Sequence, residues 1–258
     1  MERGIAGSCE DIDRNVRHRQ VPKKYYTGRV KVILIATRNA HKVQEIRAIL
    51  GDRFQFLTLD DLPHAPKVVE DRDTFAGNAA KKASELARWI SEACQSSLVT
   101  CYFVLADDSG LEVDALNGAP GVHSARFAAI DSKENSPDTD NNSKLLRLLK
   151  DVPAEKRAAR FRCVIALTPV AAGEVESASP VCYAEESGQT LLFDGACEGK
   201  IIFEARGKNG FGYDPLFVPD GFGETFAELG DDVKNKISHR SRALEKLKAF
   251  FAGQIQKV

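Results

Sequence analysis

The stretch from Cys101 to Phe127 constrains the fold more than any other part of the chain. It begins with an apolar, β-prone run from Tyr102 to Ala106, which stops abruptly at Asp107. A short apolar run without polar alternation is typical of a strand that is buried on both faces of an α/β sheet. The pattern therefore predicts an α/β fold, with a buried strand that ends at this aspartate.

Two adjacent carboxylates, Asp107 and Asp108, follow this strand at the edge where open α/β sheets bind their ligands. Like charges at the rim of a core are costly unless a cation or a proton compensates them. The pair therefore indicates a divalent metal or a proton-transfer role. A polar turn, with Asp-Ser-Gly selected only for its turn chemistry, explains this segment alone equally well. Four other stretches decide between the two interpretations.

Composition excludes several classes of protein. The chain has 258 residues, 43% of them hydrophobic and 28% charged, which is ordinary for a soluble globular protein of one large domain or two lobes. No apolar segment approaches the ~20 residues that cross a bilayer. The net charge of -1 argues against a nucleic-acid partner. The six cysteines form no C-x-x-C pair, which favours a reduced, cytoplasmic protein without zinc.

Residues 1–29 show no apolar periodicity and end in a basic stretch. We expect a disordered N-terminal extension there, followed by a single domain over residues 30–258, since no linker divides this part of the chain. An organellar transit peptide or a nucleic-acid contact is a weaker interpretation of this arm, and its acidic residues argue against the first.

Order begins with a strand, a polar turn and a helix. Val32–Ala36 is a short buried-strand pattern, and a helical pattern then runs to Leu50, where Gly51 is well placed to end it. A helix N-terminus suits a phosphate group. Lys42 in the first turn opposes the usual acidic preference, which an anionic ligand explains better than helix stability does. A solvated lysine remains the alternative.

A second helix is predicted after Thr74, which can cap it. Its expected buried stripe consists of Phe75, Ala79, Ala83, Leu86 and Ile90. Glu70 lies just upstream, so its carboxylate can face the same cleft, although most acidic loop residues are merely solvated. Only one of the neighbours Lys81 and Lys82 can face the inner side of the helix.

Further elements follow the central stretch. A half-buried strand is predicted over Gly110–Ala115, a loop over 131–143 with a helix around Leu145–Leu149, and a strand over Ala158–Leu167. Residues 169–187 suggest an extended hairpin, and 189–205 suggest two strands broken at Glu198-Gly199.

The glycine-rich stretch from Arg206 to Pro215 has the spacing G-x-x-G-x-G, which is neither a dinucleotide-binding fingerprint nor a Walker loop. Its aromatic residues, Phe211 and Tyr213, can stack on a nucleobase, and Asp214 can accept hydrogen bonds from it. The alternative is a hairpin whose aromatic residues are buried in the core.

The last motif precedes a terminal helix. Ser238 can cap this helix, which places His239 and Arg240 in its first turn. Two such side chains again oppose the helix dipole, and a ligand with anionic or carbonyl oxygens would compensate them.

Five segments together resemble the inosine triphosphate pyrophosphatase family. They are ATRNAHKVQEI (36–46), ED with TFAGNAAKKA (70–83), LADDSGLEVDALNGAPGVHSARF (105–127), GFGYDPLF (210–217) and KNKISHR (234–240). The resemblance implies an elongated mixed central sheet, two α/β lobes with the active-site cleft between them, and a homodimer. It also implies hydrolysis of ITP, dITP and XTP to the monophosphate and pyrophosphate with Mg²⁺.

The resemblance assigns roles to residues of this chain. Asp108, Lys42 and Lys82 would be catalytic, and Glu70 and Asp108 would hold the metal. Substrate contacts would come from Thr37, Asn39, Lys42, Ser109, Phe211, Gly212, Tyr213, Asp214, Lys234, His239 and Arg240. Two departures from the family pattern are Arg38, where glycine is common in the phosphate turn, and Lys236, an extra charge in the last motif.

Two other functions are compatible with these residues. One is a related-fold pyrophosphatase for other modified or standard nucleoside triphosphates. The other is a catalytically silent, nucleotide-binding regulatory protein that uses its basic N-terminal arm on nucleic acid.

Overall fold

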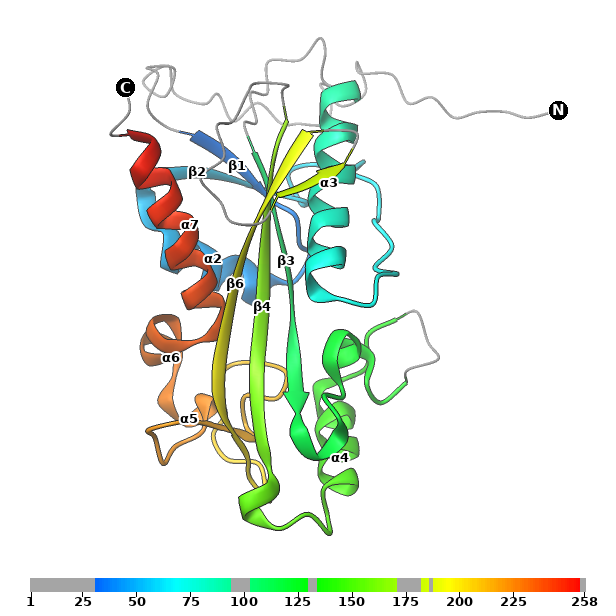
Figure 1. Ribbon diagram of the computed structural model, residues 1–258, viewed down its shortest axis with the longest axis vertical. Helices are drawn as coiled ribbons and strands as arrows, with labels where there is room; N and C mark the ends of the chain where they lie inside the picture. The colour runs from blue at the N-terminus through cyan, green and yellow to red at the C-terminus, as the bar shows by residue number, and fades with distance from the viewer. Residues whose placement is uncertain (1–30, 94–102, 130–133, 171–181, 186–187, 256–258) are drawn as a thin grey trace, which may run out of the picture.

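The computed structural model describes residues 31–93, 103–129, 134–170, 182–185 and 188–255, so the extension expected at 1–29 lies outside the described part. This part is an elongated α/β structure (Figure 1). None of its described helices is long and apolar enough to span a membrane.

The strands are β1 (Lys31–Ile35), β2 (Phe54–Thr58), β3 (Phe103–Val113), β4 (Ala158–Pro169), β5 (Cys182–Glu185), β6 (Gly188–Ile201) and β7 (Phe217–Pro219). The α-helices are α2 (Ala40–Leu50), α3 (Phe75–Ala93), α4 (Asp138–Leu148), α5 (Phe226–Leu229), α6 (Asp231–Ile237) and α7 (His239–Ile255).

The strands form one mixed sheet in the order β2-β1-β3-β4-β6-β5, with β7 also paired to β6. β1 runs parallel to β2 and β3, and the other pairs are antiparallel. The long strands β3, β4 and β6 follow the long axis of the molecule, with α7 and α2 on one side and α3 on the other (Figure 1). The elongated mixed sheet predicted from the sequence is confirmed.

The aspartate pair lies inside β3, so the prediction that the strand ends at Asp107 is wrong. Asp107 and Asp108 pair with Ile165 and Val164 of β4, and the ladder continues to Val113. The parallel neighbour β1, however, ends at Ile35, opposite Leu105. The two carboxylates therefore lie just past the carboxyl end of β1, because β3 continues beyond its neighbour.

The predicted break at Glu198-Gly199 is also wrong, because both residues lie within the continuous strand β6. A Cβ atom at Gly199 would lie 2.3 Å from the carbonyl oxygen of Val218 in β7. The glycine thus allows the two strands to approach closely. Another boundary differs as well: α4 begins at Asp138, inside the predicted loop, since acidic residues in its first turn favour a helix N-terminus.

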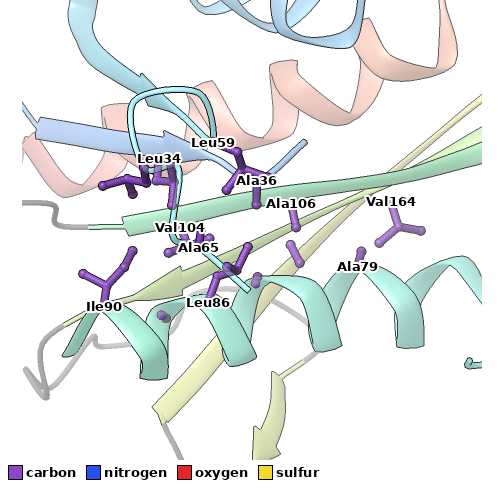
Figure 2. Packing of buried hydrophobic residues seen from close by; sticks show 14 of the residues in the cluster. Leu34, Ala36, Leu59, Ala65, Ala79, Leu86, Ile90, Val104, Ala106 and Val164 are labelled. Carbon is purple, nitrogen blue, oxygen red and sulfur yellow. The ribbon is translucent and has the colours of Figure 1, made fainter. Parts of the chain in front are cut away.

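Packing follows the predicted apolar patterns. All five stripe residues of α3 are buried, and Figure 2 shows Leu86, Ile90 and Ala79 on that helix facing Val104 and Ala106 of β3. A second cluster lies at the same end of the sheet but on its other face, where the strands pack against α2 and α7. A third cluster surrounds Leu111, Phe161 and Phe217 at the opposite end. The aspartate pair lies along β3 between the first two clusters and the third.

Candidate active site

The turn before α2 is built by its own polar side chains. The Oγ1 atom of Thr37 accepts a hydrogen bond from the N–H of Asn39 at 3.1 Å, and Oδ1 of Asn39 accepts one from the N–H of Lys42 at 3.1 Å. Asn39 thereby caps α2, whose first turn holds no acidic residue. Arg38 is not among the described residues that have a positive φ angle, so the turn does not require a glycine at this position. The result is a helix N-terminus suited to a phosphate group.

Asp107 is buried at the centre of a set of donors. Its carboxylate accepts hydrogen bonds from Nε of Arg240 at 2.9 Å, from Oγ of Ser109 at 3.1 Å and from Sγ of Cys163 at 3.1 Å, and it is paired with Lys42. Burial alone would raise the pKa of Asp107, but Arg240 and Lys42 outweigh it and hold this pKa well below its usual value. Asp107 is therefore an anion whose charge is already compensated.

The ion-pair network continues from α2 to the last motif. Glu45, buried on α2, pairs with Arg240 and accepts a hydrogen bond from Nζ of Lys234 at 2.9 Å. Lys234 in turn lies 2.5 Å from the carboxylate of Asp214. Three carboxylates (Asp107, Glu45 and Asp214) thus face three cations (Lys42, Lys234 and Arg240). We call these six residues the buried ion network.

Asp108 differs sharply from its neighbour in sequence. Its Oδ1 accepts a hydrogen bond from the N–H of Ser109 at 3.1 Å and lies 3.9 Å from Nζ of Lys82. Its Oδ2 is buried and has no hydrogen-bond partner among the described residues. Burial raises the pKa of Asp108 to about 6, although Lys82 and Lys42 act to lower it. A carboxylate with a free oxygen and a raised pKa is suited to binding a cation or accepting a proton.

Lys82 and Glu70 complete this side of the site. Nζ of Lys82 donates to the carbonyl oxygen of Asp107 at 2.7 Å and to Oε1 of Glu70 at 3.1 Å. Lys81 instead pairs with Asp71 at 2.7 Å on the surface. The structure therefore places Lys82, and not Lys81, on the inner side of α3.

The carboxylates beside Lys82 have the chemistry of a site for a divalent metal ion. Glu70 and Asp108 both approach its ammonium group, and the described residues contain no group of three or more metal-ligating side chains. Mg²⁺ at nucleotide sites is bound by one or two carboxylates together with phosphates and waters. Two carboxylates, one with an unpartnered oxygen, agree with that donor set.

The glycine-rich loop between β6 and β7 reaches the buried ion network through Asp214. This carboxylate accepts a hydrogen bond from the N–H of Phe211 at 2.9 Å. Nζ of Lys234 lies 4.5 Å from the centre of the Phe211 ring. Both backbone groups of Gly212 are held by α4: its N–H donates to Asp138 at 2.6 Å, and its carbonyl accepts from Asn142 at 3.0 Å. The phenyl ring of Phe211 is thus fixed beside the network.

Tyr213 behaves differently from the other expected base contacts. Its side chain is 3% exposed and packs in the third cluster, and its hydroxyl donates to the carbonyl oxygen of Ser124 at 2.9 Å. The core interpretation of the aromatic residues therefore describes Tyr213, whereas Phe211 remains partly exposed.

Ser238 caps α7 as predicted, since its Oγ accepts a hydrogen bond from the N–H of Ser241 at 3.2 Å. Asp107 and Glu45 compensate the charge of Arg240, so the expectation that a ligand compensates it is wrong for this residue.

His239 stacks on Phe161 with ring centres 4.8 Å apart. Burial, together with Arg240 and Lys234, holds the pKa of His239 well below its usual value, so its imidazole is neutral. Its Nδ1 atom has no hydrogen-bond partner among the described residues.

Comparison with known proteins agrees with this arrangement. The model of the Ham1 family matches residues 33–250. The chain belongs to the Ham1 family. Similar relatives include proteins named dITP/XTP pyrophosphatase from Shouchella clausii (42% identical over 221 residues, 86% of this chain and 96% of the relative) and from Geobacter sulfurreducens (46% identical over 217 residues, 84% and 94%).

Solved Ham1 structures share the fold. The Ham1 protein of Staphylococcus aureus has a TM-score of 0.68 and 35% identity, and the alignment covers 87% of this chain and 100% of that one. The Coxiella burnetii HAM1 protein has a TM-score of 0.69 at the same identity and coverage.

Some residues of this Ham1 site were not identified from the sequence. Glu45 belongs to the buried ion network, Asp138 and Asn142 hold the glycine-rich loop, and His41 packs on Phe211. A glutamate or asparagine on an amphipathic helix carries no local signal of its partners. His41 and Glu45 both lie inside the segment ATRNAHKVQEI that carries the family resemblance, which is the signal that could have identified them.

Proposed function

We propose that this Ham1 protein hydrolyses the non-standard purine nucleoside triphosphates ITP, dITP and XTP to the monophosphate and pyrophosphate, and so removes them from the nucleotide pool. The observation that carries the proposal is the carboxylate of Asp108: its buried Oδ2 has no hydrogen-bond partner among the described residues, and its Oδ1 lies 3.9 Å from Nζ of Lys82, which also pairs with Glu70. The relatives named dITP/XTP pyrophosphatase support it.

In the proposed reaction a water molecule attacks the α-phosphorus, and the bond to the departing pyrophosphate breaks. Asp108 accepts the proton of that water, since its raised pKa matches a general base better than that of an ordinary aspartate. Lys42 and Lys82 stabilise the negative charge that develops on pyrophosphate. Thr37 and Asn39 shape the helix N-terminus that receives phosphate, and Ser109 contacts the substrate beside Asp108.

Glu70 and Asp108 would hold Mg²⁺ at this site. When bound, the ion supplies positive charge that screens the phosphate oxygens and favours attack on phosphorus. In its absence, the negative charges of the triphosphate and of these two carboxylates repel each other. Turnover therefore requires the metal, and a chelator should abolish pyrophosphate release.

Base recognition is assigned to the glycine-rich loop and the start of α7. Phe211 stacks on the purine, and Gly212 and Asp214 fix that ring in position. Lys234, His239 and Arg240 are the candidate donors to the 6-oxo group. Adenine carries an amino group at C6, so it would leave such donors unpaired, and a polar pocket discriminates strongly on this basis. In this proposal Tyr213 anchors the loop through Ser124 and does not touch the base.

The family resemblance further suggests a homodimer that acts in the cytoplasm. Size-exclusion chromatography with light scattering tests the assembly independently of the chemistry. A dimer of 28.3 kDa chains is the expected result, and a monomer at micromolar concentration would contradict it.

The test of the function is a substrate panel. Pyrophosphate release is measured with Mg²⁺ for ITP, dITP and XTP against ATP and GTP. We expect kcat/KM for the first three to exceed that for ATP by about 10²-fold or more. Comparable rates on all five nucleotides would favour the broader related-fold pyrophosphatase. No release from any of them would favour the silent nucleotide-binding protein.

A further inference from the structure

The imidazole of His41 lies flat against the phenyl ring of Phe211, on which the purine base is expected to stack. The ring centres of His41 and Phe211 are 5.2 Å apart, and the two planes differ by 12°. His41 is the second residue of α2, and Phe211 lies in the loop between β6 and β7. The contact therefore joins the phosphate-binding turn to the base-binding loop. The inference from it rests on the proposed function, because it concerns how the base reaches Phe211.

Two cationic side chains also lie near Phe211, and both are fixed. Nζ of Lys234 is 4.5 Å from the ring centre, and the Lys234 side chain is held by Asp214 and Glu45. Cζ of Arg240 is 6.0 Å away, and this side chain is held by Asp107 and Glu45. Displacing either would break a buried ion pair, so neither can make room for a base.

His41 has no comparable restraint. It is exposed, and within the described part of the chain its only ring contact is Phe211, with no hydrogen bond or ion pair to its imidazole. Aromatic stacking contributes modestly at an exposed position. Of the groups around the phenyl ring, His41 is therefore the one that can move at low cost.

We propose that His41 is a placeholder for the purine: its imidazole covers Phe211 in the empty site and leaves when the base stacks there. A purine has two fused rings, so it covers more of the Phe211 ring than one imidazole does, stacks more strongly and displaces the imidazole. Stacking of His41 on Phe211 shields the phenyl ring from solvent when no substrate is bound. It also lowers the apparent affinity for every purine, because only the fraction of molecules with an uncovered ring can bind.

The test is a calorimetric titration with inosine 5′-monophosphate, the expected product, so that binding is measured without turnover. His41→Ala removes the competing ring and should tighten binding of this ligand by about 2- to 10-fold. His41→Phe keeps a flat ring over Phe211 and should bind it no more tightly than wild type. His64→Ala, which removes another exposed imidazole, should have no effect.

Ribose 5-phosphate serves as the ligand without a base. Its affinity should be equal in wild type and His41→Ala, because the inference concerns stacking only. Weaker binding of inosine 5′-monophosphate by His41→Ala would overturn the inference and assign the imidazole to direct contact with the base. An equal gain in affinity for ribose 5-phosphate would overturn it as well.

The two proposals fail in different ways. If wild type binds inosine 5′-monophosphate and His41→Ala binds it with the same affinity, the placeholder is refuted and the proposed function stands. If wild type does not bind inosine 5′-monophosphate at all, the placeholder is refuted, and the substrate panel alone decides the proposed function.

Discussion

Asp107 and Arg240 form a buried ion pair across 133 positions of the sequence, with Nε of Arg240 2.9 Å from Oδ2 of Asp107 and both side chains 0% exposed. The pair joins the middle of β3 to the first turn of α7. It compensates the charge of Asp107, whereas Oδ2 of the next residue, Asp108, has no hydrogen-bond partner in the described part of the chain. The two adjacent aspartates therefore have different roles: Asp107 holds the site together, and Asp108 is available for chemistry.

Asp107→Asn should destabilise the protein strongly. Arg240 and Lys42 would then lack a compensating charge, and breaking a buried pair in this way lowers the free energy of unfolding by about 3–5 kcal/mol. Urea denaturation measures this change. The control is Asp194→Asn, which removes an exposed pair with Lys246 at 2.7 Å and should cost about 0–1 kcal/mol. Similar losses for the two variants would show that the network does not hold the fold.

Glu45→Gln should make stability less dependent on acid pH. Burial raises the pKa of Glu45, but Arg240 and Lys234 outweigh it and hold the pKa below its usual 4.5. A group with a lowered pKa stabilises the fold above its unfolded-state pKa, and this contribution is lost as pH falls through the folded-state pKa. The difference in unfolding free energy between wild type and Glu45→Gln should thus be largest above about pH 5 and shrink on acidification. A difference that stays constant from neutral pH downward would contradict this.

Asn142→Ala should weaken substrate binding more than turnover. The amide of Asn142 donates to the carbonyl of Gly212 at 3.0 Å and helps to hold Phe211 in place. Losing one hydrogen bond of about 1 kcal/mol should raise KM for dITP about fivefold, with little change in kcat. Ser143→Ala is the control, since its hydroxyl donates a hydrogen bond within α4, to the carbonyl of Thr139 at 2.7 Å. An unchanged KM for Asn142→Ala would mean that α4 does not position the loop.

Gly199→Ala should destabilise the sheet where β6 meets β7. The added Cβ would lie 2.3 Å from the carbonyl oxygen of Val218, and relieving such overlap costs about 1–3 kcal/mol. Gly223→Ala is a matched control, because a Cβ there meets no atom of the described residues within 4 Å. Thermal unfolding compares the two variants. Equal midpoints would show that the strands do not approach as closely as the structure places them.

Much of the fold could be predicted because its elements carry local signals. The apolar stripe of α3 and the end of α2 at Gly51 both follow from spacing and cap residues. Aspartate and glycine are uncommon in strands. The sequence pattern therefore predicts that β3 is interrupted at Asp107 and that β6 is interrupted at Glu198-Gly199. Pairing with β4 overrides that local preference, because it extends through Asp107 and Asp108 of β3 and through Glu198 and Gly199 of β6.

The site was predictable only as a set of motifs. Thr37, Asn39 and Lys42 could be assigned because they share one short turn. The partners of Arg240 could not, since Glu45 lies 195 positions away and resembles a solvated helix residue. Contacts across such distances depend on the assembled sheet, which the sequence pattern does not specify residue by residue.

The role assigned to Asp108 is tested by pyrophosphate release from dITP by the Asp108→Asn protein with saturating Mg²⁺. Loss of the general base should lower kcat by about 10²–10⁴-fold. The thermal unfolding midpoint should be unchanged or higher, because the variant removes a buried charge, one oxygen of which has no hydrogen-bond partner among the residues that the structure describes. A folded Asp108→Asn protein that turns over dITP within about threefold of the wild-type rate would contradict the central role of Asp108.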